Sequence, residues 1–507
     1  MAGLCAAASA VEAGARPVVI EKGAAPGGSM RMSGGTIWTA PSMAVMETWV
    51  PGGDRERQRR LVDGIEPGLA WLESLGVTRT APIASDRQTG AELDVIALTE
   101  RLVAAIEAGG GRILTHTALE SIETPPDAAG PLAVKVVDAT GARRVSPAYS
   151  VILTTGGFGG GTDLLARYIG PFANTMLLRA NPNSTGDGLV AALGAGGRTT
   201  PSMSTFYGHT MPGLPANVPP ERWVSVTQYY TQDAILVNER GERFFDESRS
   251  MADETAPFEI VQQPGGRAWL VMDRRIHDDE PLPERSRARA REAFANAVAA
   301  GAPNVVANTI EELADGLAVM GVDRSGFLAT LEAFGRAAAA GTALALPVPR
   351  RRAAFALQEP PFRALAVRPG ITFTLGGIDV DADLRVLDGD GAPIPGLFAA
   401  GADAGGTYDR GYMGGLVLGL VQGRAAGRSA ADAVTSPRVH VEGREVDAEP
   451  GVDEAPLRRL EENGWTVRRW EEQHLFFGGV QAVARDPDTG ELSGGGDPRR
   501  GGVAVPA

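Results

Sequence analysis

The residues best suited to chemistry lie near the end of the chain, where glycines alternate with short apolar runs. Residues 397–400 predict a short buried strand, and Gly401 lets the backbone turn tightly beside a ligand. Gly414 and Gly415 then open an apolar helix, whose free N–H groups and positive dipole end face the same place. This order of strand, turn and helix predicts a seat for an electron-rich or anionic group.

A second set of such residues lies at the start of the chain. Residues 2–13 predict a helix of small residues, and residues 17–21 predict a strand that ends in the carboxylate of Glu21. Gly3 fits the third glycine of the dinucleotide fingerprint G-x-G-x-x-G. Glu21 follows it by 18 residues (21 − 3), where a carboxylate hydrogen-bonds an adenosine ribose.

The first two glycines of that fingerprint, and the strand before them, would lie upstream of Met1. That strand is central in a doubly wound sheet. Its loss would leave two buried strand edges unpaired, at about 1–3 kcal/mol for each unsatisfied backbone group. We therefore expect the encoded reading frame to extend upstream of Met1.

Composition restricts the class of protein. A chain of 507 residues with 43% hydrophobic residues predicts more than one domain with buried cores. The net charge of −14 argues against a nucleic-acid partner held by its phosphates. The single Cys5 excludes an internal disulfide framework and reads as a core residue. With no apolar run of membrane-spanning length and no basic n-region, we expect no membrane span and a cytoplasmic location.

The elements around these residues follow from periodicity. Apolar spacing predicts a helix over residues 55–76, with a break suggested by Gly64 and Pro67. Asp187 precedes a short helix and either caps it or contacts a cofactor. Further helices are expected at 93–108, 285–299 and 323–339, strands at 112–115, 134–137 and 148–154, and a strand followed by a turn at 234–243.

Taken in order, the glycine motifs resemble those of flavoproteins of the fumarate reductase, succinate dehydrogenase and 3-ketosteroid dehydrogenase superfamily, with tricarballylate-dehydrogenase-like members nearest. Any one glycine pair would be only a turn, so the ordered set carries the resemblance. It covers about residues 1–430 and rests on residues 27–29, 33–35, 153–157, 184–188, 370–377 and 401–427.

The resemblance implies an α/β fold in four parts. A Rossmann-like FAD-binding domain, with its first strand missing, would occupy residues 1–200 and 350–435. An α+β capping domain at 201–349 would be inserted into it, and a short, mostly β tail would follow at 436–507. The composition of the capping segment changes accordingly, with aromatic residues at Tyr207, Trp223, Tyr229 and Tyr230.

The tail resembles the C-terminal end of gamma-glutamyltransferases. The match runs through residues 437–443, 449–451, 477–483, 486–490 and 496–501. The alternative is an ordinary tail of hairpins, because Asp488-Thr-Gly490 is common turn chemistry. That family's catalytic threonine has no counterpart here, so no hydrolase activity is expected from the tail.

The resemblance also implies the cofactor and the residues that contact it. The FAD would be non-covalent, because nothing like the family's flavin-linking histidine occurs around Gly27 to Gly35. The implied FAD contacts are Ala2, Gly3, Glu21, Lys22, Gly28, Ser29, Ser33, Gly34, Gly35, Ala118, Leu119, Thr154, Gly156, Asp187, Gly401, Ala402, Asp403, Gly415, Leu416 and Val417. No metal site is expected.

The implied chemistry is hydride transfer between a substrate carbon and flavin N5, with a protein group handling the proton on the adjacent carbon. This sequence departs from the fumarate reductases at three places: Tyr412 replaces the proton-transferring arginine, Thr372 or Phe373 replaces a histidine, and Ala402 replaces a glutamate. Fumarate reduction itself is therefore not expected.

Tyr408 and four further residues remain near the expected site, and the four are the catalytic candidates. Tyr412 resembles the tyrosine chemistry of ketosteroid dehydrogenation, or is a packing aromatic. His209 stands where the family has a substrate-binding histidine, or is structural. Arg410 could anchor a substrate carboxylate or face solvent, and Arg249 completes the set.

Three functions compete. The first is an FAD-dependent oxidoreductase acting on a CH–CH or C=C bond of a ketosteroid or carboxylate, with a small-molecule substrate and an unknown electron acceptor or donor. The second is an inactive product of a truncated and fused gene. The third, a gamma-glutamyl hydrolase or transferase, depends on the tail alone.

Overall fold

The chain folds into two compact units. The computed structural model describes residues 1–125, 130–249, 252–278, 284–352, 356–435, 439–452, 454–472, 476, 481–485 and 492–496. One unit comprises residues 1–12 and 17–430, and the other comprises residues 13–16 and 431–507. Within the described ranges, no helix has the length and apolar character needed to cross a membrane.

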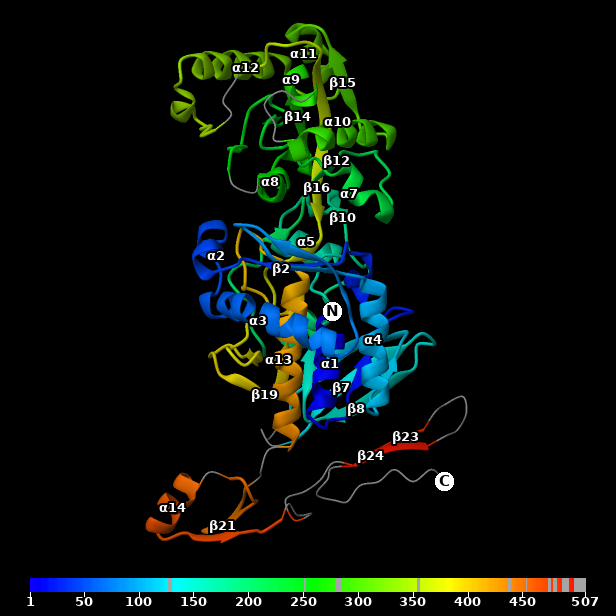
Figure 1. Cartoon of the computed structure of the whole chain (residues 1–507), viewed down its shortest axis with the longest axis vertical. Helices are drawn as coiled ribbons and strands as arrows, with labels where there is room; N and C mark the ends of the chain where they lie inside the picture. The colour runs from blue at the N-terminus through cyan, green and yellow to red at the C-terminus, as the bar shows by residue number, and fades with distance from the viewer. Residues whose placement is uncertain are drawn as a thin grey trace. The chain divides into compact units, whose positions relative to one another are not determined.

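The first unit contains the strand and helix pattern expected for nucleotide binding (Figure 1). Two parallel pairs form it: β1 (Val18–Ile20) with β5 (Arg112–Leu114), and β9 (Val151–Leu153) with β19 (Pro393–Ala399). β18 (Arg385–Leu387) extends the second pair as an antiparallel edge. Among the described strands, the two pairs belong to separate sheets instead of one continuous sheet.

Helices and small antiparallel sheets surround these pairs. The helices are α1 (Ala2–Glu12), α2 (Met43–Trp49), α3 (Arg55–Ser74), α4 (Val95–Ala108), α5 (Thr162–Tyr168), α6 (Asp187–Gly194) and α13 (Leu416–Thr435). The sheets are β2 (Thr36–Thr39), β4 (Thr89–Leu93) and β3 (Arg79–Ala84), and β6 (Thr117–Glu123), β7 (Leu132–Asp138) and β8 (Arg143–Ala148). The expected strand at 148–154 is present as β9, but it is shorter, because Ala148 is the last residue of β8.

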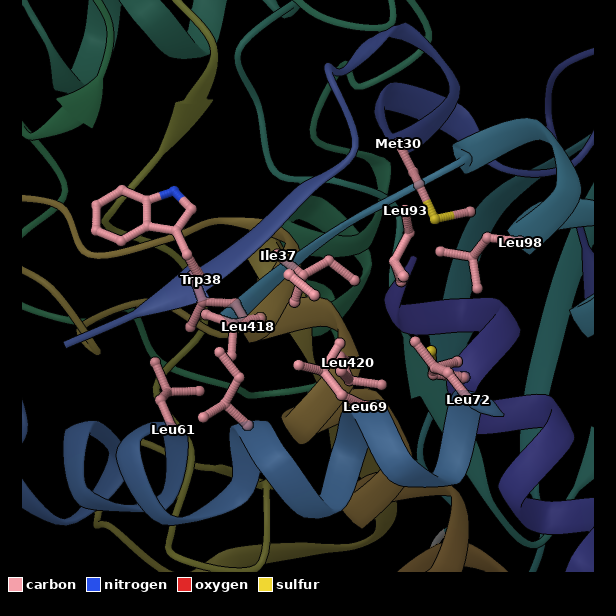
Figure 2. Close-up of a cluster of buried hydrophobic side chains, with 14 of the residues drawn as sticks. Met30, Ile37, Trp38, Leu61, Leu69, Leu72, Leu93, Leu98, Leu418 and Leu420 are labelled. Atoms are coloured by element: carbon pink, nitrogen blue, oxygen red, sulfur yellow. The ribbon is translucent and has the colours of Figure 1, made fainter. Parts of the chain in front are cut away.

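The helix expected over 55–76 is present as α3, but the predicted break at Gly64 and Pro67 is wrong. Gly64 and Gly68 give close packing instead of a kink. A Cβ on Gly64 would lie 2.8 Å from Val421, and one on Gly68 would lie 2.9 Å from Leu420, both on α13. Figure 2 shows the leucines of the same two helices, with Leu61 and Leu69 of α3 packed beneath Leu418 and Leu420.

The capping region is built on a six-stranded sheet. Its central strand is β16 (Phe362–Ile371), which pairs with β10 (Leu177–Leu178), β12 (Thr210–Pro212), β14 (Ala268–Met272) and β15 (Asn304–Ala307); β13 (Ile235–Val237) pairs with β14. The helices are α7 (Trp223–Val226), α8 (Ala252–Ile260), α9 (Arg274–Asp278), α10 (Glu284–Ala299), α11 (Ile310–Val319) and α12 (Arg324–Ala339). The sheet of the capping region thus takes in strands on both sides of the expected segment 201–349.

Two strands bridge the capping sheet and the nucleotide-binding pattern. β11 (Phe206–Tyr207) pairs antiparallel with β17 (Phe373–Thr374), and Tyr207 lies opposite Phe373. β17 follows directly on β16, so the chain passes from the capping sheet into this bridge without a loop. The candidate site is assembled around it.

The second unit has a small core of its own. β20 (Val439–Glu442), β21 (Glu445–Ala448) and β22 (Thr466–Arg469) form one sheet, on which α14 (Glu454–Glu462) packs through Leu457. β23 (Gln481–Arg485) and β24 (Leu492–Gly496) form a hairpin. The tail motifs at 437, 477–480, 486–490 and 497–501 lie outside the described residues.

Candidate functional site

The predicted turn between β19 and α13 is confirmed. Gly401 follows the strand with φ of 69°, a backbone conformation that a side chain disfavours. Its N–H donates to Oε1 of Gln422 on α13 at 3.0 Å, and Nε2 of Gln422 donates to Oγ1 of Thr407 at 3.0 Å. The side chain of Gln422 therefore connects α13 to the turn that follows β19.

Three of the segments expected to contact FAD converge here. A Cβ on Gly401 would lie 2.8 Å from Cβ of Ala2, and a Cβ on Gly3 would lie 2.7 Å from Oγ1 of Thr154. Gly156, in the same loop as Thr154, has φ of 96°. Because these glycines have no side chain, neighbouring side chains lie directly against the backbone at Gly3, Gly156 and Gly401.

Glu21 ends β1 as expected. Its Oε1 accepts the N–H of Gly23 at 2.7 Å, and its main-chain carbonyl accepts the N–H of Thr117 at 3.0 Å. Ala118 and Leu119 follow Thr117 on β6. The carboxylate and the segment expected near the adenine are thus neighbours.

Lys22 and Asp187 form an ion pair. Nζ of Lys22 donates to Oδ2 of Asp187 at 2.9 Å and to Oγ1 of Thr185 at 2.7 Å. The alternative that Asp187 caps α6 is wrong, because the cap residue is Gly186, with φ of 92° and no side-chain hydrogen bond. The carboxylate is turned toward Lys22 instead.

The glycine segments between β1 and β2 are close-packed. Oγ of Ser29 accepts the N–H of Asn181 at 3.1 Å, and Oγ of Ser33 donates to the carbonyl of Met30 at 2.7 Å. Gly28 and Gly35 have φ of 53° and 77°. At Gly34 a Cβ would meet nothing within 4 Å, so the chain is open there.

Asp403 is buried and fixes the loop after β9. Its Oδ1 accepts the N–H of Gly157 at 2.8 Å and the hydroxyl of Thr155 at 3.0 Å, and its Oδ2 accepts the N–H of Thr155. Burial raises the pKa of Asp403, and the N–H groups of Gly157 and Thr155 partly offset that rise. Its carboxylate positions the loop, while Ala402 beside it lines a small cavity.

The start of α13 lies beside a small cavity. Gly414, with φ of 101°, has no room for a Cβ, which would overlap the carbonyl oxygen of Trp38. The first-turn N–H groups of a helix lack intrahelical partners. The N–H of Gly415 donates to the hydroxyl of Tyr412 at 2.9 Å. The adjacent cavity, lined by residues that include Phe373, Ala402 and Tyr408, measures about 10 Å³, room for one water. A ring system would therefore require these side chains to move.

Tyr412 lies in a stack of aromatic rings at the bridge. Its ring is parallel to that of Tyr207, with centroids 3.6 Å apart and planes at 13°, and it meets Trp38 edge-on at 5.5 Å. Burial raises the pKa of Tyr412 to about 12, and the hydrogen bond from Gly415 N–H works against that rise. The phenol is therefore protonated at neutral pH.

Tyr207 connects this stack to His209. The Tyr207 hydroxyl and Nε2 of His209 are 2.9 Å apart, and Nδ1 of His209 lies 3.5 Å from Oδ2 of Asp253. Burial raises the pKa of Tyr207 well above its ordinary value. Burial and the charge of Arg179 lower the pKa of His209, although Asp253 raises it. The imidazole is therefore neutral at pH 7.

Two carboxyl groups at the start of α8 hold different protonation states. Burial works to raise the pKa of Asp253, but hydrogen bonds from His209 and Glu254 lower it on balance. Burial, together with the charge of Asp253, raises the pKa of Glu254 well above its ordinary value. Asp253 is thus the ionised partner and Glu254 the protonated one.

The structure does not bring the four catalytic candidates together. Arg410 is exposed, with φ of 48°, and Arg249 is exposed with its guanidinium 5.7 Å from the Phe245 ring. No contact among the described residues joins either arginine to the Tyr412 stack. Only His209 and Tyr412 share the site.

Sequence reasoning missed four members of this site: Arg179, Tyr207, Asp253 and Glu254. The spacing of Tyr207 and His209, two residues apart in an extended segment, was an available signal because alternate residues of a strand share one face. Arg179, Asp253 and Glu254 had no comparable signal, since only the tertiary fold brings them near His209.

Comparisons with known proteins identify the family of the chain. A model of the FAD binding domain family matches residues 1–77 and 52–415. NADH:fumarate oxidoreductase of Klebsiella pneumoniae (strain 342) is 27% identical over 447 residues, 82% of this chain and 44% of that protein. The 4-oxocyclohexanecarboxylate 2-dehydrogenase of Sinomonas cyclohexanicum is 29% identical over 370 residues, 68% of this chain and 60% of its own. The chain thus spans about half the length of these two relatives.

Among solved structures, 3-ketosteroid-Δ4-(5α)-dehydrogenase from Rhodococcus jostii superposes with a TM-score of 0.62 at 22% identity, over 85% of this chain and 94% of that one. That likeness concerns the fold. The gamma-glutamyltransferase resemblance of the tail and the expected upstream extension receive no support from these matches.

Proposed function

The chain belongs to the FAD-binding family of oxidoreductases that includes the fumarate reductases, and on that premise we propose that it acts on a CH–CH or C=C bond with non-covalent FAD. The observation that carries the proposal is the convergence of Ala2, Gly3, Thr154 and Gly401 at the start of α13. FAD, when bound, supplies the acceptor or donor of the hydride at N5.

The chain's own residues would hold the cofactor along this surface. Glu21 would accept hydrogen bonds from the adenosine ribose, next to Ala118 and Leu119. The first-turn N–H groups of α13, at Gly415 to Val417, would face the electron-rich edge of the flavin ring. The hydroxyl of Tyr412 now accepts from one of these donors, so it would give that donor up on binding.

We assign proton transfer to the Tyr412 and Tyr207 pair. In the reductive direction one substrate carbon gains the hydride and its neighbour gains a proton from a phenol; dehydrogenation is the reverse. Tyr412 is protonated at neutral pH, as a general acid must be. Tyr207 has a route to refill its proton, through its hydrogen bond with the neutral His209 and on to Asp253.

The substrate class has two candidates at this point. The names of the curated relatives mention fumarate and 4-oxocyclohexanecarboxylate, which are carboxylates, and the solved neighbour is a ketosteroid enzyme. The aromatic stack of Tyr207, Phe373 and Tyr412 suits either a conjugated acid or a steroid ring.

Purified protein tests the proposal. The full chain should carry flavin absorbance, release free FAD on denaturation, and show substrate-dependent oxidation or reduction of the flavin with a member of a carboxylate and 3-ketosteroid panel. A folded chain without flavin would favour the inactive alternative. Cleavage of a gamma-glutamyl anilide would be required to revive the transferase alternative.

A further inference from the structure

Arg179 is the residue near the candidate site for which the fold gives no structural role. It directly follows β10, and its N–H donates to the carbonyl of Ile371 at 2.7 Å. Its side chain crosses Gly370, because a Cβ there would lie 3.0 Å from Cδ of Arg179. The N–H of Gly370 in turn donates to the carbonyl of His209 at 2.8 Å, so Arg179 passes beside the histidine.

The guanidinium group of Arg179 has buried atoms without partners. Nε and Nη1 are buried and make no hydrogen bond, and no carboxylate of the described chain lies within ion-pair distance. The buried residues Arg350 and Arg368 are paired: Arg350 donates to Glu247 at 3.0 Å, and Arg368 donates to the carbonyl of Pro212 at 3.1 Å. Arg179 is half-buried as a residue, and because buried donors without partners are costly, its Nε and Nη1 point to a partner from outside the chain.

Within the described part of the chain, no carboxylate forms an ion pair with Arg179. The positive charge of Arg179 opposes the rise in the pKa of Tyr207 and of Tyr412, and it contributes to the lowered pKa of His209. Arg179 therefore acts on all three rings. Asp253 is engaged by His209, and the raised pKa of Glu254 keeps that group neutral.

More unpartnered polar atoms lie in the same region. Oγ1 of Thr372 and Oε2 of Glu254 are buried without hydrogen bonds. Thr372 is tied to the stack, because its N–H donates to the carbonyl of Tyr207 at 2.7 Å. The region therefore offers a cation and several polar groups next to aromatic rings, which suits an anionic organic molecule.

We propose that Arg179 binds a carboxylate of the substrate and thereby places the reacting carbons beside the rings of Tyr207 and Tyr412. The inference rests on the proposed function and narrows its substrate class to carboxylic acids, in preference to neutral ketosteroids. Guanidinium and carboxylate match in geometry, and the pair is stronger than a neutral hydrogen bond. Arg179 takes the anchoring role that the sequence suggested for the exposed Arg410.

The experiment measures binding to the FAD-loaded full chain by the change in flavin absorbance. The probes are fumarate against its diamide, and 4-oxocyclohexanecarboxylate against its primary amide, so that each pair differs in charge and not in shape. The variants are Arg179→Gln and Arg179→Lys. Arg167→Gln is the matched control, because Arg167 is an exposed arginine on α5 whose contact is with Tyr168.

Wild type should bind each acid more tightly than its amide. Arg179→Gln should raise the dissociation constants of the acids by roughly 10- to 100-fold, the usual loss for a hydrogen-bonded ion pair, and leave the amides within about twofold. For Arg179→Lys, the dissociation constants of the acids should lie between those of the wild type and of Arg179→Gln, because lysine keeps the positive charge but lacks the planar guanidinium group. The dissociation constants measured for Arg167→Gln should equal those of the wild type.

Three outcomes would overturn the inference: acids and amides binding wild type equally, unchanged acid binding in Arg179→Gln, or weaker FAD binding in that variant with substrate binding intact. The last would assign Arg179 to the cofactor's phosphates. If Arg179→Gln does not fold, the Lys variant and the wild-type comparison still decide. If the chain holds no flavin, the proposed function fails separately, and fumarate-induced thermal stabilisation, lost in Arg179→Gln, still tests the anchor.

Discussion

At the scale of single residues, the candidate site is a set of protonation states fixed by burial. Tyr207 and Tyr412 are held as neutral phenols, His209 as a neutral imidazole and Glu254 as a neutral acid. Asp253 is the ionised member. Neutral, protonated groups of this kind can donate a proton, while Asp253 is the one ionised group among these five residues.

Replacing Tyr412 or Tyr207 by phenylalanine tests which phenol transfers the proton. The variant that lacks the transferring hydroxyl should keep its flavin but slow substrate-dependent flavin reduction by roughly 10²–10⁴-fold, the range for general acid–base groups. Ring volume is preserved, so the stacking at 3.6 Å should survive. Stopped-flow absorbance on both variants gives the answer.

The flavin spectrum is the internal control for that pair. If both phenylalanine variants turned over at the wild-type rate, the two tyrosines would be packing residues and His209 would become the leading candidate.

Glu254→Gln should stabilise the chain more at high pH than at low pH. The raised pKa means that folded Glu254 keeps a proton which the unfolded chain releases above the ordinary value of 4.5. The stability it contributes is complete below pH 4.5 and declines as the pH rises. Glutamine mimics the protonated acid, so its gain in unfolding free energy should be larger at pH 8 than at pH 4.5.

Urea unfolding of both proteins at the two pH values measures that difference. His209 acts in the opposite direction, since its lowered pKa removes stability as the pH falls below 6.5. Taking the variant minus the wild type at each pH cancels this contribution. A gain that is the same at pH 4.5 and pH 8 would contradict the assignment.

At the scale of elements, α13 packs closely against α1, which carries the expected FAD contacts Ala2 and Gly3. Gly419, Gly423 and Gly427 form one face at four-residue spacing, which places them one above another along the helix. That face meets α1: a Cβ on Gly423 would overlap the backbone of Ala2, and one on Gly427 that of Ala6. The two helices approach so closely only because these residues have no side chain.

Gly423→Ala should therefore destabilise the chain although alanine is the better helix former. Overpacking against the backbone of α1 costs about 1–3 kcal/mol, more than the ~1 kcal/mol gained in helix propensity. Gly194→Ala is the matched control, because it lies in α6 with nothing within 4 Å of its Cβ, and it should stabilise by up to about 1 kcal/mol. Thermal melting compares the two.

The cofactor content of Gly423→Ala carries a second expectation. Displacement of α1 would move Ala2 and Gly3 from Thr154, so flavin should be lost together with stability. A variant that is less stable yet fully flavinated would show that α1 does not set the cofactor surface.

At the scale of the whole molecule, the division into two units bears on the tail. Each unit has its own buried core, and that of the second is small, with Val446, Ala448 and Leu457 at its centre. The candidate site is contained entirely in the first unit. Folding and flavin binding should therefore depend on the first unit alone.

A chain ending at Ser436 should keep its flavin and melt within about 3 °C of the full chain, since α13 is complete by Thr435. Absorbance and differential scanning calorimetry measure both quantities. Loss of flavin on this truncation would show that the tail is integrated with the FAD-binding unit.

The sequence by itself determined the local parts of this protein. The strand before Gly401, the helix after Gly415 and the carboxylate at the end of β1 were all predicted, because a glycine turn or a helix start depends on a few neighbouring residues. Amphipathic spacing likewise predicted α10 and α12.

The tertiary structure decided what long-range contacts control. α3 continues through Pro67 and packs its glycines against α13, and Asp187 turns to Lys22 instead of capping α6. The capping sheet takes in β16, whose partners lie up to almost 200 residues away in the chain. The environment of Arg179 likewise depends on residues far away in sequence. Burial then sets the protonation state of each polar group, and burial is a property of the packed fold and not of residue order.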